Sequence, residues 1–206
     1  MGPAPISTAF LLTSLLAVFL LQAAAEAVGM RLWLLAVTRT AQMLAIMILA
    51  VVQSGGLQVI GLDRSALLPG IKKGLVWSAG FAGVAGLMFI GLFITGQDPL
   101  MLVRSPLPEG TGQRILFFFI GGIIGPVFEE IFFRGLIFGY LRRWGVPAAV
   151  LISTAVFAAF HLNTIPITQI VGGVVFAVAY HTGGSLMVPI VIHVLGNLAI
   201  FALSLL

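Results

Sequence analysis

The chain has 206 residues, of which 60% are hydrophobic and only 8% are charged, with a net charge of +4. Soluble domains contain about 25% charged residues, so this composition excludes a soluble globular protein, whose surface would expose large apolar patches and aggregate. The basic residues are scattered at helix ends and form no patch with aromatic residues, which indicates contact with anionic lipid and not with nucleic acid. The absence of cysteine excludes disulfides, thiolate metal sites and a cysteine nucleophile.

Seven apolar stretches follow one another along the chain, and most have the length that crosses a bilayer as a helix. They cover residues 7–25, 32–52, 74–94, 115–141, 147–160, 167–180 and 186–203, of which the fifth and sixth are short for a full span. No Lys or Arg precedes Arg31, so the first stretch lacks the positive region of a signal peptide and is predicted to be a retained helix. We therefore expect an all-α fold, a polytopic transmembrane helix bundle with about seven spans.

The connections between these stretches indicate how the chain is organised. Residues 57–73 mix apolar and charged side chains, which predicts an amphipathic connector at the membrane interface. Residues 97–113 contain three prolines and form the longest predicted loop. We expect one integrated membrane domain with two parts: residues 1–113, which hold N-terminal membrane helices and the connector, and residues 114–206, which hold most of the unusual polar side chains.

Polar side chains in the second part stand out because residues 144–206 contain no Asp, Glu, Lys or Arg at all. The fourth predicted span reads Gly-Pro-Val-Phe-Glu-Glu-Ile-Phe-Phe-Arg, the fifth ends in Phe-Ala-Ala-Phe-His, and the seventh contains His-Val-Leu-Gly-Asn. The side chains of interest are Glu129, Glu130, Arg134, Phe157, His161, His193 and Asn197. An ionised side chain at the bilayer centre costs at least ~2.5–3.5 kcal/mol on insertion scales, so such residues need either a partner or a function.

Helical spacing predicts which of the charged side chains are paired. Glu130 and Arg134 are four residues apart, so they lie on one face and can form an ion pair, and a structural role is the simpler account of them. Glu129 is turned about 100° away and must find a partner on another helix or in a wet cavity. Pro126 is expected to disturb this helix and open its backbone next to the carboxylates. Arg39, within the second span, has no partner that the sequence reveals.

The imidazole and amide groups follow the same spacing. Phe157 and His161 share one helical face, and His193 and Asn197 share another. Counted at about 1.5 Å of rise per residue, these groups and Glu129 lie at depths that allow them to meet. The sequence therefore predicts one polar site built from three separate spans.

Two arrangements for peptide hydrolysis fit these groups. In the first, a carboxylate near an imidazole takes a proton from water, while a second imidazole and an amide donate hydrogen bonds to the developing oxyanion. In the second, two histidines and one glutamate hold zinc with an open position for water. The sequence lacks His-Glu-x-x-His and Gly-x-Ser-x-Gly, so neither a soluble-type zinc peptidase nor a serine nucleophile elbow is indicated.

At these residues the chain resembles the CAAX protease and bacteriocin-processing family of intramembrane endopeptidases, also called the CPBP or Abi family. The family pattern is Glu-Glu-x-x-x-Arg on one helix, Phe-x-x-x-His on the next, and His-x-x-x-Asn or Asp near the end. All three appear here in that order within residues 114–206, which the resemblance makes the catalytic core. The first half of the chain is similar only in consisting of membrane helices.

The resemblance implies a peptidase that hydrolyses a peptide bond of a membrane-associated or lipidated substrate, in the plasma membrane of a prokaryote. By analogy, Glu129 activates water with His161, His193 and Asn197 bind the oxyanion, and Glu130, Arg134 and Phe157 support the site. The family has been described both as glutamic proteases and as metalloproteases. We expect no obligatory cofactor; if zinc is bound, its ligands are Glu129, His161 and His193. The expected partners are membrane lipid and a peptide or protein substrate near the membrane, with no nucleic acid.

Two other functions fit some of the same residues. A non-catalytic membrane scaffold, or a bacteriocin self-immunity protein, would use the fold to bind a peptide or a partner. A small transporter or proton relay would use Glu129 and the histidines as a titrating chain, but transporters usually have duplicated halves with broken helices in matching places. Taken singly, each histidine is more simply a helix cap or interhelical glue. Their joint occurrence favours the peptidase.

Overall fold

The structure is a computed structural model that describes residues 5–161 and 167–206. Within these ranges the chain forms helices joined by turns and short loops, and no β-strand occurs. In this described part of the chain, four helical segments are long and apolar enough to cross a membrane, and three further apolar helices are shorter. The chain is thus an all-α, multi-pass membrane protein, which confirms the class that the composition predicted.

The helices lie close to the predicted spans. In chain order they are α1 (Thr8–Val28), α2 (Leu32–Ser54), α3 (Arg64–Ile94), α4 (Thr111–Phe119), α5 (Gly125–Glu129), α6 (Gly139–Leu141), α7 (Val146–Ala159), α8 (Ile167–Gly183) and α9 (Met187–Leu203). Three 3₁₀ turns connect them: η1 (Leu57–Ile60), η2 (Pro99–Leu102) and η5 (Arg142–Trp144). Two π-helical segments, η3 (Ile120–Ile124) and η4 (Glu130–Phe138), join α4, α5 and α6 into one continuous helix.

Local sequence explains where several helices begin and end. The Ser7 side chain caps α1 by accepting a hydrogen bond from the backbone N–H of Phe10 at 3.1 Å, and the Asp63 side chain caps α3 by accepting one from the N–H of Ser65 at 2.8 Å. Ser and Asp oxygens satisfy the free N–H groups of a first helical turn. At the other end, Gly55 closes α2 with a φ of 77°, a left-handed conformation that glycine adopts without steric cost.

The third span begins earlier than the sequence predicted. The expected amphipathic connector at residues 57–73 is divided between η1 and the first turns of α3, which starts at Arg64 and continues through Pro69. The Asp63 cap explains this start, because a capped first turn lets the helix begin ten residues before the apolar run at Gly74.

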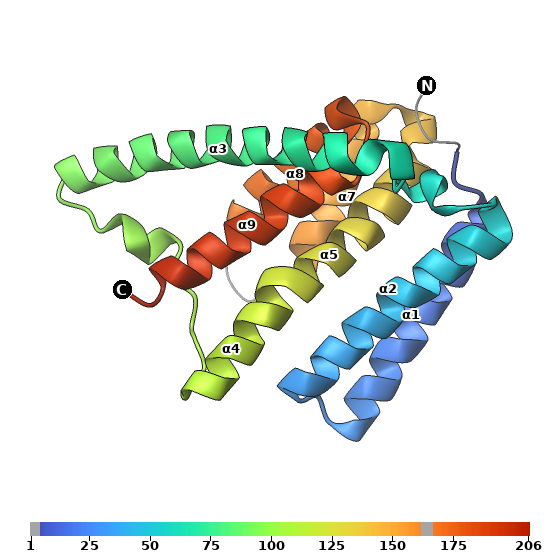
Figure 1. Ribbon diagram of the computed structural model, residues 1–206, viewed down its shortest axis with the longest axis horizontal. Coiled ribbons are helices and arrows are strands. Elements are labelled where there is room, and N and C mark those ends of the chain that lie inside the picture. Colours follow the sequence, from blue (N-terminus) through green and yellow to red (C-terminus); the bar gives the residue numbers. More distant parts are fainter. Residues whose placement is uncertain (1–4, 162–166) are drawn as a thin grey trace.

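The continuous α4–α6 helix lies at the centre of the fold (Figure 1). The α1–α2 hairpin packs on one side of it through α2, and α7, α8 and α9 pack on the other side. Helix α3 runs alongside α9. Side chains from α1, α2 and η4 meet in the interior, where Phe10, Ile46, Leu136 and Phe138 are fully buried. This arrangement places the Glu-Glu-x-x-x-Arg sequence of α5 and η4 against α7 and α9. Helix α7 carries Phe157, and α9 carries His193 and Asn197.

The central helix is π-helical on both sides of α5, close to Pro126. The N–H of Gly125 donates to the carbonyl of Ile120, five residues earlier. The next residue is Pro126, which has no N–H. As a result, the Gly121 carbonyl has no donor from its own helix at either residue 125 or residue 126. The predicted disturbance at Pro126 therefore takes the form of a π segment with an opened carbonyl, which is a common feature of functional helices.

Candidate active site

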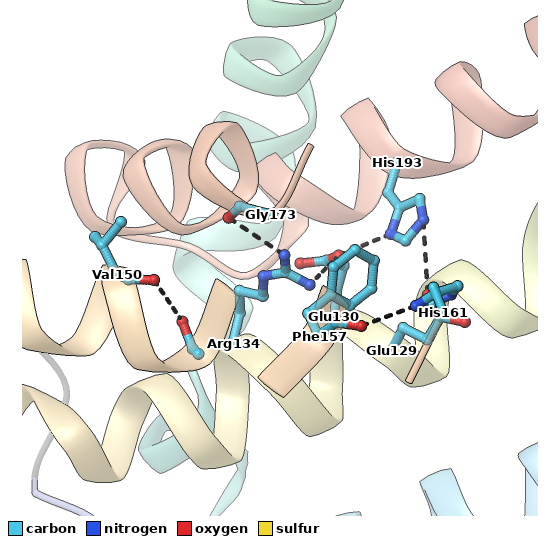
Figure 2. A network of polar contacts seen from close by, with 9 residues as sticks. Glu129, Glu130, Arg134, Val150, Phe157, His161, Gly173 and His193 are labelled. Atoms are coloured by element: carbon cyan, nitrogen blue, oxygen red, sulfur yellow. Dashed lines mark hydrogen bonds and ion pairs between the residues drawn. The ribbon is translucent and has the colours of Figure 1, made fainter. Parts of the chain in front are cut away.

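The Glu130–Arg134 pair lies at the centre of the polar network and is completely buried. Nη1 of Arg134 lies 3.0 Å from Oε1 of Glu130, and both side chains have an exposed fraction of 0%. Nη2 of Arg134 donates to the carbonyl of Gly173 in α8 at 3.3 Å. The predicted intrahelical pair is therefore confirmed, and its guanidinium also ties α8 to the central helix (Figure 2).

Aromatic rings enclose the guanidinium of Arg134. Its central carbon lies 4.5 Å from the ring centroid of Phe157 and 5.1 Å from that of Phe176. Rings at this distance stabilise a desolvated cation through their quadrupole. This contact gives a physical reason for the phenylalanine in the Phe-x-x-x-His sequence, and it agrees with the supporting position expected for Phe157.

His193 joins both glutamates to α9. Its Nδ1 lies 2.7 Å from Oε1 of Glu130, and its Nε2 lies 3.8 Å from Oε2 of Glu129. Because the same oxygen of Glu130, Oε1, also accepts from Arg134, it is the acceptor in this contact and Nδ1 of His193 carries the hydrogen. The imidazole is further fixed by stacking on Phe176, with ring centroids 4.5 Å apart. Nε2 is thereby directed at Glu129.

Glu129 is the more accessible of the two carboxylates. Its side chain is 23% exposed, whereas that of Glu130 is fully buried. Of the two expected situations, a partner on another helix or a wet cavity, the first is met by His193 in α9, which forms an ion pair with Glu129 when its imidazole is protonated. A carboxylate that is accessible and also adjacent to an imidazole can exchange a proton with water.

His161 lies in the turn that follows α7. Its Nδ1 is 2.8 Å from the carbonyl oxygen of Phe157, and because a carbonyl can only accept, Nδ1 is the donor. In the neutral ring Nε2 is then the unprotonated nitrogen, able to accept a proton or a hydrogen bond. The Phe157 ring lies beside both imidazoles, with centroids 4.8 Å from that of His161 and 6.0 Å from that of His193. Within the described ranges no direct ion pair joins His161 to Glu129.

Asn197 contacts the backbone of the central helix. Its Nδ2 donates to the Gly121 carbonyl at 2.9 Å, the carbonyl that the π segment and Pro126 leave without a donor. Glycine allows the close approach there, because a Cβ on Gly121 would lie 3.1 Å from the Phe201 ring and one on Gly122 would lie 2.5 Å from a methyl group of Leu198, so these neighbours would have to shift. One amide hydrogen of Asn197 thus holds α9 against the opened backbone, a contact that the sequence analysis did not anticipate.

The predicted zinc ligands would have to gather around one metal position. Among residues 5–161 and 167–206, no three His, Asp or Glu side chains form a group that could hold a metal ion. Glu129, His161 and His193 are thus not gathered as a metal-holding group among these residues, and the expectation of no obligatory cofactor, with zinc as the alternative, stays a prediction.

Three residues in or beside the network were not predicted from the sequence. Phe176 stacks on His193, and the Gly173 carbonyl accepts a hydrogen bond from Arg134. A Cβ on Gly173 would lie 2.8 Å from the Thr154 methyl, so glycine lets α8 pack closely on α7. Arg39 of α2 lies over the ring of Phe128, 4.9 Å from its centroid. Only Arg39 gave a signal in advance, as a charge in an apolar span without a partner.

Fold and site together define a multi-pass helical membrane protein with an acid, an imidazole and an arginine joined in one buried network. Residues 111–199 match the family described as type II CAAX prenyl endopeptidase Rce1-like. A curated relative, the membrane-embedded CAAX protease MroQ of Staphylococcus aureus, is 37% identical over 108 residues. That match covers 48% of this chain and 41% of the relative, so the chain matches less than half of the relative's length. No solved structure matches the chain significantly.

These comparisons confirm the resemblance that the three sequence patterns predicted. The matched residues 111–199 contain all seven predicted site residues, from Glu129 to Asn197. The relative is a bacterial, membrane-embedded protein, which agrees with the expected integral, multi-pass membrane localisation in a prokaryote.

Proposed function

We propose that this protein is an intramembrane endopeptidase in which Glu129 activates a water molecule for attack on a peptide bond. The observation that carries the proposal is the position of Glu129, a partly exposed carboxylate 3.8 Å from the Nε2 of His193 inside an apolar helix bundle. An intramembrane carboxylate with a titratable neighbour is functional by default. The match to the CAAX endopeptidase family supports the reaction class.

In the proposed reaction the Glu129 carboxylate takes a proton from water as the water oxygen attacks the carbonyl carbon. His161 assists through Nε2, which the bond from Nδ1 to the Phe157 carbonyl leaves unprotonated. The tetrahedral oxyanion then collapses, the carbon–nitrogen bond breaks, and the proton held by Glu129 passes to the leaving amine. The products are a new carboxyl group and a new amine.

His193 and Asn197 are proposed to stabilise the oxyanion. His193 can donate from Nε2 only as an imidazolium, since Nδ1 already donates to Glu130; the Glu130 carboxylate stabilises that cation. Asn197 gives one amide hydrogen to Gly121 and has a second for the oxyanion. Glu130 and Arg134 act by holding His193, because their pair fixes the acceptor to which Nδ1 is bound.

The proposed substrate is a peptide or protein held at the membrane, by an apolar segment or by a lipid group, and the remaining partner is lipid itself. The reaction is proposed without an obligatory metal, and a chelator titration tests this part of the proposal. A peptidase of this kind keeps its rate when a chelator is titrated into the assay. Loss of cleavage with EDTA, restored by added zinc, would favour the metal-dependent alternative.

The test uses the purified protein in detergent with a panel of internally quenched peptides, each carrying a farnesyl, palmitoyl or transmembrane anchor. Cleavage is followed by fluorescence, and incorporation of ¹⁸O from labelled water into the new carboxyl group identifies hydrolysis by mass spectrometry. Glu129→Gln and His161→Ala should each lower the rate by at least about 10². Glu109→Gln and His181→Ala are matched controls, since both residues are exposed at loop or helix-end positions away from the network.

Each variant must retain the elution profile and melting temperature of the unmodified protein for its rate to count. Full activity in Glu129→Gln or His161→Ala would reject the assignment. Failure of the unmodified protein to cleave any anchored peptide would favour the non-catalytic scaffold or immunity protein.

A further inference from the structure

We propose that Arg39 is a positioning residue of the Glu129 site, in which its guanidinium supplies the positive charge that stabilises the Glu129 carboxylate. The inference deepens the proposed endopeptidase and rests on it for its catalytic part. It also adds to the site a residue from α2, which lies outside the region that matches the CAAX endopeptidase family, residues 111–199.

Two glutamines fix the position of the guanidinium. Nη1 of Arg39 donates to Oε1 of Gln42 at 2.8 Å and to Oε1 of Gln22 at 3.2 Å. Gln42 is fully buried and is itself held by a bond from its Nε2 to the Val18 carbonyl at 3.0 Å. A buried amide anchored on the backbone of α1 makes a rigid acceptor, so the arginine has a defined direction and does not extend freely into lipid.

The fixed direction is towards the segment that carries Glu129. The guanidinium carbon lies 4.9 Å from the ring centroid of Phe128, the residue that precedes Glu129 in the chain. Helix α2 packs directly against α5 and η3. Glu129 and Glu26 are the carboxylates that lie within Coulombic range of Arg39. Arg39 and Glu129 are not in direct contact, so the attraction acts through space.

The distribution of the other charges gives Arg39 this role. Arg134 also lies within Coulombic range of Glu129, but its guanidinium is hydrogen-bonded to Glu130, and His193 carries a positive charge only when protonated on both nitrogens. Without Arg39, Glu129 would have no permanent cation of its own, since Arg134 is paired with Glu130, and a charge that is only partly compensated between membrane helices is disfavoured. The permanent cation from α2 compensates that charge in every protonation state of the imidazoles.

The first test measures the coupling of the two charges and needs no peptidase activity. Melting temperatures in detergent are compared for the unmodified protein, Arg39→Met, Glu129→Gln and the double variant. If Arg39 stabilises the Glu129 carboxylate, Arg39→Met lowers the melting temperature less when Glu129→Gln is already present. The same cycle with Glu109→Gln serves as control and should be additive, because Glu109 lies in an exposed loop. Strict additivity of Arg39→Met with Glu129→Gln would overturn the inference.

The second test uses the absence of cysteine from the chain. In Arg39→Cys, 2-aminoethyl methanethiosulfonate forms a mixed disulfide with the single thiol, releases methanesulfinate and adds a cation. The 2-sulfonatoethyl reagent adds an anion by the same reaction. We expect Arg39→Met and Arg39→Cys to lower kcat about tenfold or more with little change in KM, since the charge acts on the reacting group. The aminoethyl reagent should restore most of the rate, and the sulfonatoethyl reagent should not.

A matched control is Val37→Cys, on the same helix, where the native side chain is 56% exposed at the apolar surface. Neither reagent should change its rate. An unchanged kcat in Arg39→Met, or equal recovery with both reagents, would overturn the positioning role, because a purely structural side chain needs bulk and not charge. If the unmodified protein cleaves no peptide, the proposed function fails, and the melting-temperature cycle still decides whether Arg39 and Glu129 are coupled.

Discussion

Replacing Asn197 by alanine is predicted to destabilise the protein through a single backbone carbonyl. In the native fold the amide of Asn197 donates to the Gly121 oxygen at 2.9 Å. No donor of the same helix can replace it, because the Gly125 N–H is bound to Ile120 and residue 126 is proline. The Asn197→Ala variant therefore leaves this oxygen without a partner inside the bundle.

The size of the effect follows from the membrane setting. Interhelical hydrogen bonds in membrane proteins contribute about 0.6 kcal/mol on average and up to about 1.7 kcal/mol, while leaving a buried acceptor unsatisfied costs about 1–3 kcal/mol. Because this carbonyl has no alternative donor in its own helix, we expect Asn197→Ala to lower the free energy of unfolding by about 1.5 kcal/mol, at the upper end of the membrane range. Pro126→Ala supplies an N–H in the register of the π segment, so in that background the loss should fall to about 0.5 kcal/mol.

The assay is reversible unfolding in mixed micelles, with SDS as the denaturant and far-UV circular dichroism as the signal. Leu195→Ala is the matched control, since this side chain lies on the same helix, is 41% exposed and makes no hydrogen bond; its effect should stay within about 0.5 kcal/mol. Equal stability of Asn197→Ala and the unmodified protein would refute the reasoning. So would an equal loss with and without the Pro126→Ala substitution, because the orphaned carbonyl would then not be the cause.

Two further predictions concern the buried network. Arg134→Met should lower the free energy of unfolding by about 3–5 kcal/mol, because it leaves Glu130 as an uncompensated buried charge. Adding Glu130→Gln should recover part of that loss, and a double variant that is less stable than Arg134→Met would contradict the pairing. In the second prediction, Gly173→Ala should lower the free energy of unfolding by about 1–3 kcal/mol through overpacking, since the new Cβ would lie 2.8 Å from the Thr154 methyl. Thr154→Ala removes the clashing atoms and should restore most of the stability, which thermal unfolding in detergent will measure.

The central helix illustrates what can be predicted from local spacing. Glu130 and Arg134 pair as their four-residue separation indicated, because neighbouring positions on one helix are fixed by the chain itself. The expectation that Glu129 has a partner on another helix is also confirmed, since the energetic cost of a lone membrane carboxylate does not depend on the fold. The identity of that partner, His193, depended on how α9 is rotated against the central helix, which spacing within one helix cannot give.

Asn197 and Arg39 illustrate what spacing could not predict. The contact of Asn197 with Gly121 arises from a π segment whose altered hydrogen-bond register is a property of the folded backbone. Arg39 was visible only as an unexplained charge, and its place over Phe128 depends on the packing of α2 against a helix about ninety residues further along the chain. Both contacts join segments that are remote in sequence, so no local pattern encodes them.

By itself the sequence determined that this chain is a bundle of membrane helices and which side chains are too polar for lipid, because hydropathy and helical period are properties of single segments. The tertiary structure alone decided that Glu130 bridges Arg134 and His193, that aromatic rings enclose the guanidinium, and that an arginine from α2 lies over Phe128, the residue next to Glu129. These contacts depend on the rotation and depth of whole helices. Those are set by the packing of many side chains at once and not by the spacing of a few.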